Sequence, residues 1–235
     1  MKNKIVYLLI LLISISCNEL QQVVNQLPQG GVSIGNEEIA KGLQQALNQG
    51  IEKQVSKLSE ESGFFKNELV KIMLPEELQK VDKTLRDIGL AKLADEGLRV
   101  MNNAAEDAVS EATPIFVDAV KNINFQDAKA ILVGADNSAT EYLKATTETA
   151  LYDKFNPVIN SSFKKVGADQ IWSNLISKYN SIPLTKNVNP NLTDYVTQEA
   201  LNGVFTMIAI EEKEIRNKVS ARTTALLQKV FAIQD

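Results

Sequence analysis

Apolar residues recur at helical spacing from Asn36 almost to the end of the chain, and no segment shows the alternation of a strand. The clearest stripe follows Gly89 and consists of Leu90, Leu93, Ala94, Leu98, Met101, Ala105, Ala108, Val109 and Ala112. Such an alanine-rich stripe favours close packing of one helix on another. The connections between stripes are mostly short, which favours antiparallel neighbours around one core. The pattern therefore predicts an all-α fold, a single compact domain of about nine or ten helices over residues 36–235.

Capping residues and prolines divide this domain into its expected helices. Asn36 is expected to cap the first helix, and Thr113 is expected to cap another that has Pro114 at its first position. Pro157 is expected to end one helix and to open a short segment that stops at Gly167. Other signals are Pro75 and Gly89 at the two ends of a helix, Asn124 as a cap, Ser138 with Glu141 as a capping box, and Ser220 as the last cap. Residues 180–191 predict a long loop.

Residues 1–16 have the layout of a bacterial export signal. Lys2 and Lys4 precede an apolar run over residues 5–13, and small residues lead to Cys17. The run is shorter than the ~20 residues that a membrane-spanning helix needs. The segment resembles a bacterial lipobox in which Ser14 replaces the usual leucine. We therefore expect cleavage before Cys17 and lipid attachment to it, over the alternative of an ordinary signal with a leftover cysteine.

Residues 17–35 are expected to form a lipid-anchored tether, because they are rich in glutamine and asparagine and end in proline and glycine. Removal of residues 1–16 takes away two lysines and leaves 23 basic against 29 acidic residues, a net charge of −6. Such a charge does not favour nucleic acid as a partner, nor the anionic surface of a membrane. The expected membrane contact is therefore the lipid at Cys17 alone.

The composition excludes several kinds of active site. The chain has no histidine, so it can hold no imidazole base, no Ser-His-Asp triad and no histidine metal ligand. If Cys17 carries lipid, no thiol remains for a disulfide or for thiolate catalysis. A single tryptophan among 6% aromatic residues argues against the sugar-binding platforms of glycosidases. We therefore expect no metal and no cofactor, and a protein that is not an enzyme.

Seven polar residues lie on or beside apolar helical faces and form a candidate polar cluster: Asn102, Glu106, Asp127, Glu211, Glu212, Arg216 and Arg222. Charged groups in a helical core cost several kcal/mol, on the order of a buried ion's desolvation, unless they are paired and hydrogen-bonded. One interpretation is a structural clasp between the last two helices, in which a glutamate of the 211–212 pair binds Arg216 or Arg222, while Asp127 supports its own helix. The alternatives are a pocket in which one of these arginines binds an anionic ligand, and a hydrolase or lyase that uses two of the carboxylates as acid and base.

An ordered series of short motifs resembles one family. The motifs are Gly42-Leu43 to Gly50, Leu74-Pro75, Met101-Asn102-x-Ala-Ala-Glu106-x-Ala108, Phe116, Asp127-Ala128-x-x-Ile131-Leu132-x-Gly134, Ala139-Thr140-x-Tyr142, Glu211-Glu212-x-x-Ile215-Arg216 and Ala221-Arg222-Thr223-Thr224-x-Leu226-Leu227-x-x-Val230-Phe231. Together they cover residues 36–235 and are similar to the bacterial family catalogued as domain of unknown function 4197. The resemblance implies an all-α envelope protein, often a predicted lipoprotein. It implies no reaction.

These features together predict a lipid-anchored protein of the bacterial cell envelope. Asn18, rather than aspartate, follows the expected lipidation site, which favours the outer membrane, with the domain facing the periplasm or the cell surface. We expect the helical domain to be a non-enzymatic module that binds a protein or a small molecule. The alternatives are a carboxylate-dependent hydrolase or lyase and a purely structural spacer. A binding module predicts an apolar cleft on which arginines and backbone donors converge. An enzyme predicts two carboxylates that converge in an open cleft, at least one of them with a strongly shifted pKa, and a spacer predicts no pocket.

Overall fold

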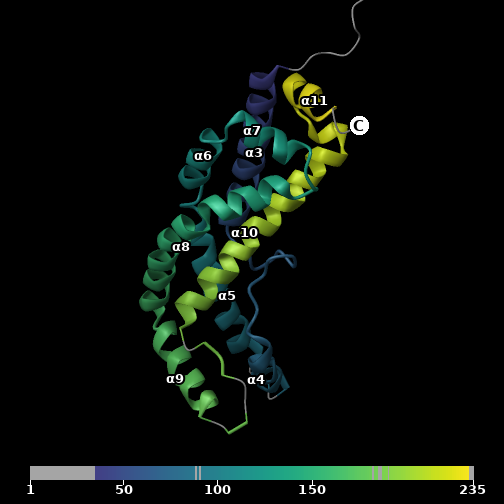
Figure 1. Ribbon diagram of the computed structural model, residues 1–235. Helices are drawn as coiled ribbons and strands as arrows, with labels where there is room; N and C mark the ends of the chain where they lie inside the picture. The colour runs from purple at the N-terminus through teal and green to yellow at the C-terminus, as the bar shows by residue number, and fades with distance from the viewer. Residues whose placement is uncertain are drawn as a thin grey trace, which may run out of the picture. The chain divides into compact units, whose positions relative to one another are not determined.

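The computed structural model describes residues 35–87, 89, 91–181, 183–184, 187–189 and 191–232, which are helical and contain no strand (Figure 1). The helices are α3 (Asn36–Ser59), α4 (Glu76–Asp87), α5 (Ala91–Val109), α6 (Thr113–Lys121), α7 (Phe125–Leu132), α8 (Ser138–Val166), α9 (Ala168–Asn180), α10 (Leu192–Asn217) and α11 (Ala225–Phe231), with a 3₁₀ turn at Val219–Ala221. The all-α prediction is confirmed for these residues. The expected signal over residues 1–16, the lipidation site Cys17 and the tether up to residue 34 lie outside them.

Helices α8 and α10 pack along each other at the centre of the described domain (Figure 1). Each contributes an almost fully buried apolar stripe whose residues are four or eight positions apart: Leu143, Leu151, Phe155, Ile159 and Phe163 on α8, and Val196, Ala200, Val204 and Ile208 on α10. Helix α5 packs on both helices of this central pair, and α3 packs on α10 and on α5. The buried stripes on four helices make one shared core, as the spacing of apolar residues predicts.

The shorter helices cover the two ends of the core. Helices α6, α7 and α11 pack on α3, whereas α4 packs on α5, and α9 packs on α8 and α10 (Figure 1). The contact between α3 and α11 depends on Gly42, because a Cβ atom there would lie 2.5 Å from Cγ2 of Val230. No helix in the described part of the chain combines the length and the apolar character that crossing a bilayer demands.

Pro157 lies inside α8, so the predicted helix end at this residue is wrong. Proline removes one backbone hydrogen bond and costs a helix interior about 3 kcal/mol. Phe155, Ile159 and Phe163 are fully buried around it, and burying each such side chain is worth about 1.5–3 kcal/mol. Core packing therefore outweighs the local preference. The predicted end at Gly167 is confirmed, since this residue has a left-handed φ of 69° as the C-cap of α8.

Several predicted caps move by a few residues. The cap of α3 is Gly35 rather than Asn36. The backbone nitrogen of Gly35 donates a hydrogen bond to the carboxylate of Glu38 at 3.1 Å. Ala112, not Thr113, precedes α6 as its cap. The last helix is capped by Thr224, whose hydroxyl accepts from the nitrogen of Leu227 at 3.2 Å, while the predicted cap Ser220 lies in the 3₁₀ turn. The prediction for Asn124 is confirmed: its side chain accepts from the nitrogen of Asp127 at 3.0 Å.

The start of α8 departs most from the local pattern. The predicted capping box of Ser138 and Glu141 does not form; Ser138 is the first residue of the helix, and Glu141 accepts a hydrogen bond from Asn137 at 3.2 Å instead. The first free backbone amides of α8 are satisfied by a carboxylate from α10, which belongs to the candidate polar cluster.

Candidate functional site

Glu212 and Arg216 form a buried ion pair one turn apart on α10. Nε and Nη2 of Arg216 lie 2.9 and 2.8 Å from Oε1 of Glu212. The two side chains are only 4% and 6% exposed, in the order arginine, glutamate. We call these two residues the polar clasp, because each of them also binds a different neighbouring helix.

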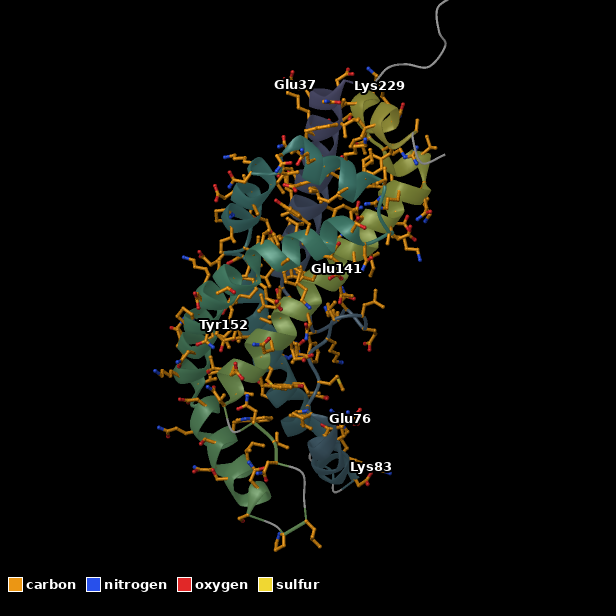
Figure 2. All side chains as sticks on the ribbon, viewed as in Figure 1. Glu37, Glu76, Lys83, Glu141, Tyr152 and Lys229 are labelled. Carbon is orange, nitrogen blue, oxygen red and sulfur yellow. The ribbon has the colours of Figure 1, made fainter. Side chains whose placement is uncertain are left out.

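Glu212 binds the N-terminus of α8, the end that Figure 2 marks with Glu141. The carboxylate accepts hydrogen bonds from the backbone nitrogens of Ala139 at 2.9 Å and Thr140 at 2.8 Å, and from the hydroxyl of Thr140 at 2.8 Å. A helix leaves its first amides without partners and carries partial positive charge at this end. Glu212 thus acts as an N-cap supplied by another helix.

Arg216 binds the C-terminus of α7. Its Nη1 donates to the carbonyl oxygen of Leu132 at 3.1 Å, and its Nη2 donates to that of Ile131 at 2.9 Å. These are among the last carbonyls of α7, where the helix dipole favours a cation. The polar clasp therefore ties the end of α7 and the start of α8 to α10, with each charge placed at the helix end that stabilises it.

Arg222 binds the C-terminus of α10 and is only 2% exposed. Its Nε donates to the carbonyl oxygen of Ile215 at 3.0 Å, and its Nη2 donates to that of Arg216 at 2.8 Å. The guanidinium carbon lies 6.0 Å from the ring centre of Phe231 on α11. Arg222 therefore closes the connection between α10 and α11.

Glu211 lies next to Glu212 in the sequence but has different partners. Its carboxylate accepts from Nζ of Lys53 at 2.7 Å and from Nε2 of Gln54 at 2.8 Å, both on α3. The side chain of Glu211 packs against Gly50. A Cβ atom added at Gly50 would lie 3.4 Å from Cγ of Glu211. Glu211 thus joins α10 to α3, and the two glutamates serve separate contacts.

Asn102 and Glu106 on α5 hold the segment between α3 and α4. Asn102 is fully buried; its Oδ1 accepts from the nitrogen of Ile72 at 2.8 Å and its Nδ2 donates to the oxygen of the same residue at 3.0 Å. Glu106 accepts from the backbone nitrogens of Ser62 and Phe64 at 3.2 and 3.1 Å. Both side chains fix backbone rather than face solvent.

Asp127, another residue of the candidate polar cluster, does not take part in the polar clasp. It is half-buried in the first turn of α7, where its negative charge suits the helix N-terminus. Burial, and then the charge of Asp127, raises the pKa of Tyr142 above its ordinary value. The structure thus pairs Glu212 with Arg216 and places Arg222 on the backbone of Arg216. The other predicted residues bind elsewhere: Glu211 binds α3, Asn102 and Glu106 bind the segment between α3 and α4, and Asp127 lies in the first turn of α7.

The space beside the polar clasp is too small for an organic ligand. A cavity of about 20 Å³ is lined by apolar residues of α3, α8, α10 and α11 together with Glu212 and Arg216. Such a volume holds about one water molecule. This geometry favours the clasp interpretation over an anion-binding pocket. The expected place of the clasp, between the last two helices, is wrong, because the pair lies within α10 and binds α7 and α8. Among the residues that the structure describes, no group of three or more acidic side chains is placed to hold a metal ion.

A larger pocket lies at the other end of the domain, bounded by α5 and α9. It has a volume of about 470 Å³, within the range of roughly 300–1,000 Å³ that small-molecule sites occupy. Its apolar lining includes Leu74, Leu98, Met101, Val166, Ile171 and Trp172. We call it the apolar pocket. Val166 and Ile171 are 57% and 70% exposed, so apolar surface extends from the pocket to solvent.

Trp172 and Gly97 give the apolar pocket its character. Trp172 is only 6% exposed, as its place on an apolar stripe predicts, and its ring stacks on that of Tyr195 with 6.1 Å between centres. Its indole nitrogen is buried and has no hydrogen-bond partner among the residues that the structure describes. A Cβ added at Gly97 would meet no atom within 4 Å, so this glycine borders open space. The sequence analysis did not predict this pocket, because helical periodicity does not show where two packed helices leave a space; Gly97, a glycine inside the α5 pattern, is a signal that could have indicated it.

Comparison with known proteins identifies a family but no individual relative. A family model described as "Protein of unknown function (DUF4197)" matches residues 33–232. No curated protein and no solved structure matches the chain.

Proposed function

This chain belongs to the DUF4197 family of proteins of unknown function, and from that premise we propose that it is a lipid-anchored bacterial envelope protein whose helical domain binds a small apolar ligand without catalysing a reaction. The observation that carries the binding role is the apolar pocket between α5 and α9. Its volume, its aliphatic lining and its single indole ring are typical of a site for an organic molecule.

The partners of the buried carboxylates support a non-enzymatic role. Glu106 binds backbone amides of the segment before α4, Glu211 binds α3, and Glu212 binds α8. A hydrolase or lyase that works with paired carboxylates needs two of them converging on one substrate. Here each of these three buried carboxylates forms its hydrogen bonds with a different structural element.

The anchor in this proposal is a lipid on Cys17. The sequence before this residue has the layout of an export signal, and the residues after it, up to the start of α3, are polar enough to serve as a tether. Mass spectrometry of the mature protein from its native host tests the anchor. We expect an N-terminal peptide that begins at acylated Cys17, and an unmodified cysteine there would refute this part of the proposal.

Ligand binding is tested with the uncharged probe N-phenyl-1-naphthylamine, whose fluorescence rises in an apolar site. We expect a saturable rise with the purified domain. Replacing Gly97 by leucine places a side chain in the open space of the pocket, so Gly97→Leu is expected to abolish the rise while circular dichroism still reports a folded helical protein.

A matched control is Ala145→Leu, which places the same leucine side chain at an exposed position of α8. This variant is expected to bind the probe as the unchanged protein does. Absence of saturable binding in the unchanged protein, or equal binding by Gly97→Leu, would overturn the proposed function.

A further inference from the structure

We infer that the apolar pocket takes an unbranched aliphatic chain that carries a cationic head group, such as an amine or a quaternary ammonium. This inference rests on the proposed function, because it names the class of ligand for the same pocket. Two independent features of the lining support it: the small residues that border its interior and the sign of the charges at its edge.

Small side chains make the pocket suitable for a slender ligand. Ala94 and Gly97 lie one turn apart on α5, and Ala168 lies at the start of α9. Because these residues have a methyl group or no side chain, they leave a space between the helices. A polymethylene chain can fill this space with many dispersion contacts. A tail in this space also removes its own surface from water, which is worth about 0.8 kcal/mol for each buried CH₂ group.

The charged side chains of the described pocket lining are acidic. Among the lining residues that the structure describes, the charged ones are Asp82 on α4 and Glu96 on α5. A third carboxylate, Asp95, precedes Glu96 in the sequence. An anionic head group, such as the carboxylate of a fatty acid, would meet repulsion here, whereas an ammonium group would be attracted.

Two arginines close to the lining residues in the sequence or the fold have other partners: Arg99 lies over the ring of Phe65, and Arg86 is bound by carboxylates. Nε of Arg86 lies 2.8 Å from Oδ2 of Asp82, and its Nη1 lies 2.8 Å from Oδ1 of Asp95. These hydrogen bonds, the one to Asp82 first, raise the pKa of Arg86 above its ordinary value. Arg86 therefore offsets one of the three carboxylates and is held away from a ligand anion, while Glu96 stays exposed.

The experiment compares dodecyltrimethylammonium with dodecanoate, two probes with similar tails and opposite charges, each below its critical micelle concentration. Trp172 is the only tryptophan of the chain and lines the pocket, so its fluorescence reports binding of either probe directly. At low salt we expect the cationic probe to bind about tenfold more tightly, since attraction and repulsion at the edge both favour it. At 1 M salt, where the Debye length is about 3 Å, the preference should shrink.

The variant Glu96→Gln removes an exposed charge at the edge and should lower the ratio of the two affinities about threefold without loss of binding. Glu52→Gln, an exposed position on α3 that is not among the pocket-lining residues, makes the same change in net charge and should leave the ratio unchanged. This pair separates the local effect of the pocket from the overall charge of the protein.

The outcomes distinguish the inference from the proposed function. If both probes bind equally, or the anion binds better, and Gly97→Leu abolishes binding, the pocket is a ligand site but the cationic head group is wrong. If neither probe nor the uncharged dye binds, the proposed function fails and the inference fails with it. Equal ratios in Glu96→Gln and Glu52→Gln would also refute the inference.

Discussion

Glu212 and Arg216 hydrogen-bond to each other across one turn of α10 and at the same time bind the first amides of α8 and the last carbonyls of α7. The anion lies at the positive end of one helix, and the cation lies at the negative end of another. The pair thus compensates its own desolvation with at least five further hydrogen bonds to neighbouring helices. An ion pair of this kind specifies where three helices meet, which is the role we expect it to serve.

Replacement of Arg216 by alanine tests this role. The change leaves the buried Glu212 without its cation and the carbonyls of α7 without their donors, so we expect it to lower the free energy of unfolding by about 3–5 kcal/mol. The measurement is a denaturant titration followed by circular dichroism. The exposed pair of Lys41 and Glu37, also one turn apart on a helix, provides the control. Lys41→Ala should not change stability measurably, and a loss below about 1 kcal/mol for Arg216→Ala would contradict a buried clasp.

The sequence predicts the residues of the polar clasp but not their partners on other helices. Helical phase was enough to select Glu212 and Arg216 as polar residues on an apolar face, because that signal depends only on spacing within one helix. Their helix-end partners could not be predicted, since Ala139 and Leu132 are 73 and 84 residues away from the side chains that bind them. The local capping box at Ser138 looked sufficient, yet the tertiary contact replaced it.

The apolar pocket is a second feature that the sequence predicts only in part. The periodicity of α5 and α9 correctly placed Leu98, Met101 and Trp172 in the interior. Whether two buried stripes meet or leave a space between them depends on the angle at which the two helices pack and on how their side chains fit together. The pattern of a single helix gives neither of these. Pro157 is a related case: a local helix-breaking signal lost to core packing that only the assembled fold supplies.

Two glycines are expected to respond to alanine with opposite signs. Gly97 lies inside α5 beside open space, so Gly97→Ala should stabilise the protein by about 0.5–1 kcal/mol through helix propensity. Gly42 lies inside α3, where a Cβ would lie 2.5 Å from Cγ2 of Val230, so Gly42→Ala should destabilise it by about 1–3 kcal/mol. Thermal unfolding of both variants measures the difference. Stabilisation by both changes would show that α3 and α11 do not pack this closely.

Tyr152 should titrate at a higher pH than an ordinary tyrosine. Its hydroxyl on α8 donates to Oδ1 of Asp194 on α10 at 2.7 Å, and this bond first, then burial, raises the pKa of Tyr152 (Figure 2). A raised pKa means that the bond contributes stability fully below the ordinary value of about 10 and loses it as the pH rises through the folded value. The ultraviolet difference spectrum between the unchanged protein and Tyr152→Phe gives the pKa. Asp194→Asn should lower it, and an unchanged value would exclude Asp194 as the main cause.

Asn102→Ala is expected to release the segment that joins α3 to α4. The buried amide of Asn102 serves both backbone groups of Ile72, so its removal leaves a donor and an acceptor without partners inside the protein. Each such group costs about 1–3 kcal/mol, and the combined loss should therefore exceed about 2 kcal/mol.

The segment over residues 60–75 is also held by the backbone bonds of Glu106, so local opening rather than global unfolding should be the first consequence. Limited proteolysis and hydrogen exchange of these residues test this directly, and both should accelerate in Asn102→Ala. Asn103→Ala is the matched control, because Asn103 is the neighbouring asparagine of α5 and is exposed. Equal protection of the segment in the two variants would show that Asn102 does not hold it, and that the buried Phe64, Val70 and Ile72 are enough to keep it on the core.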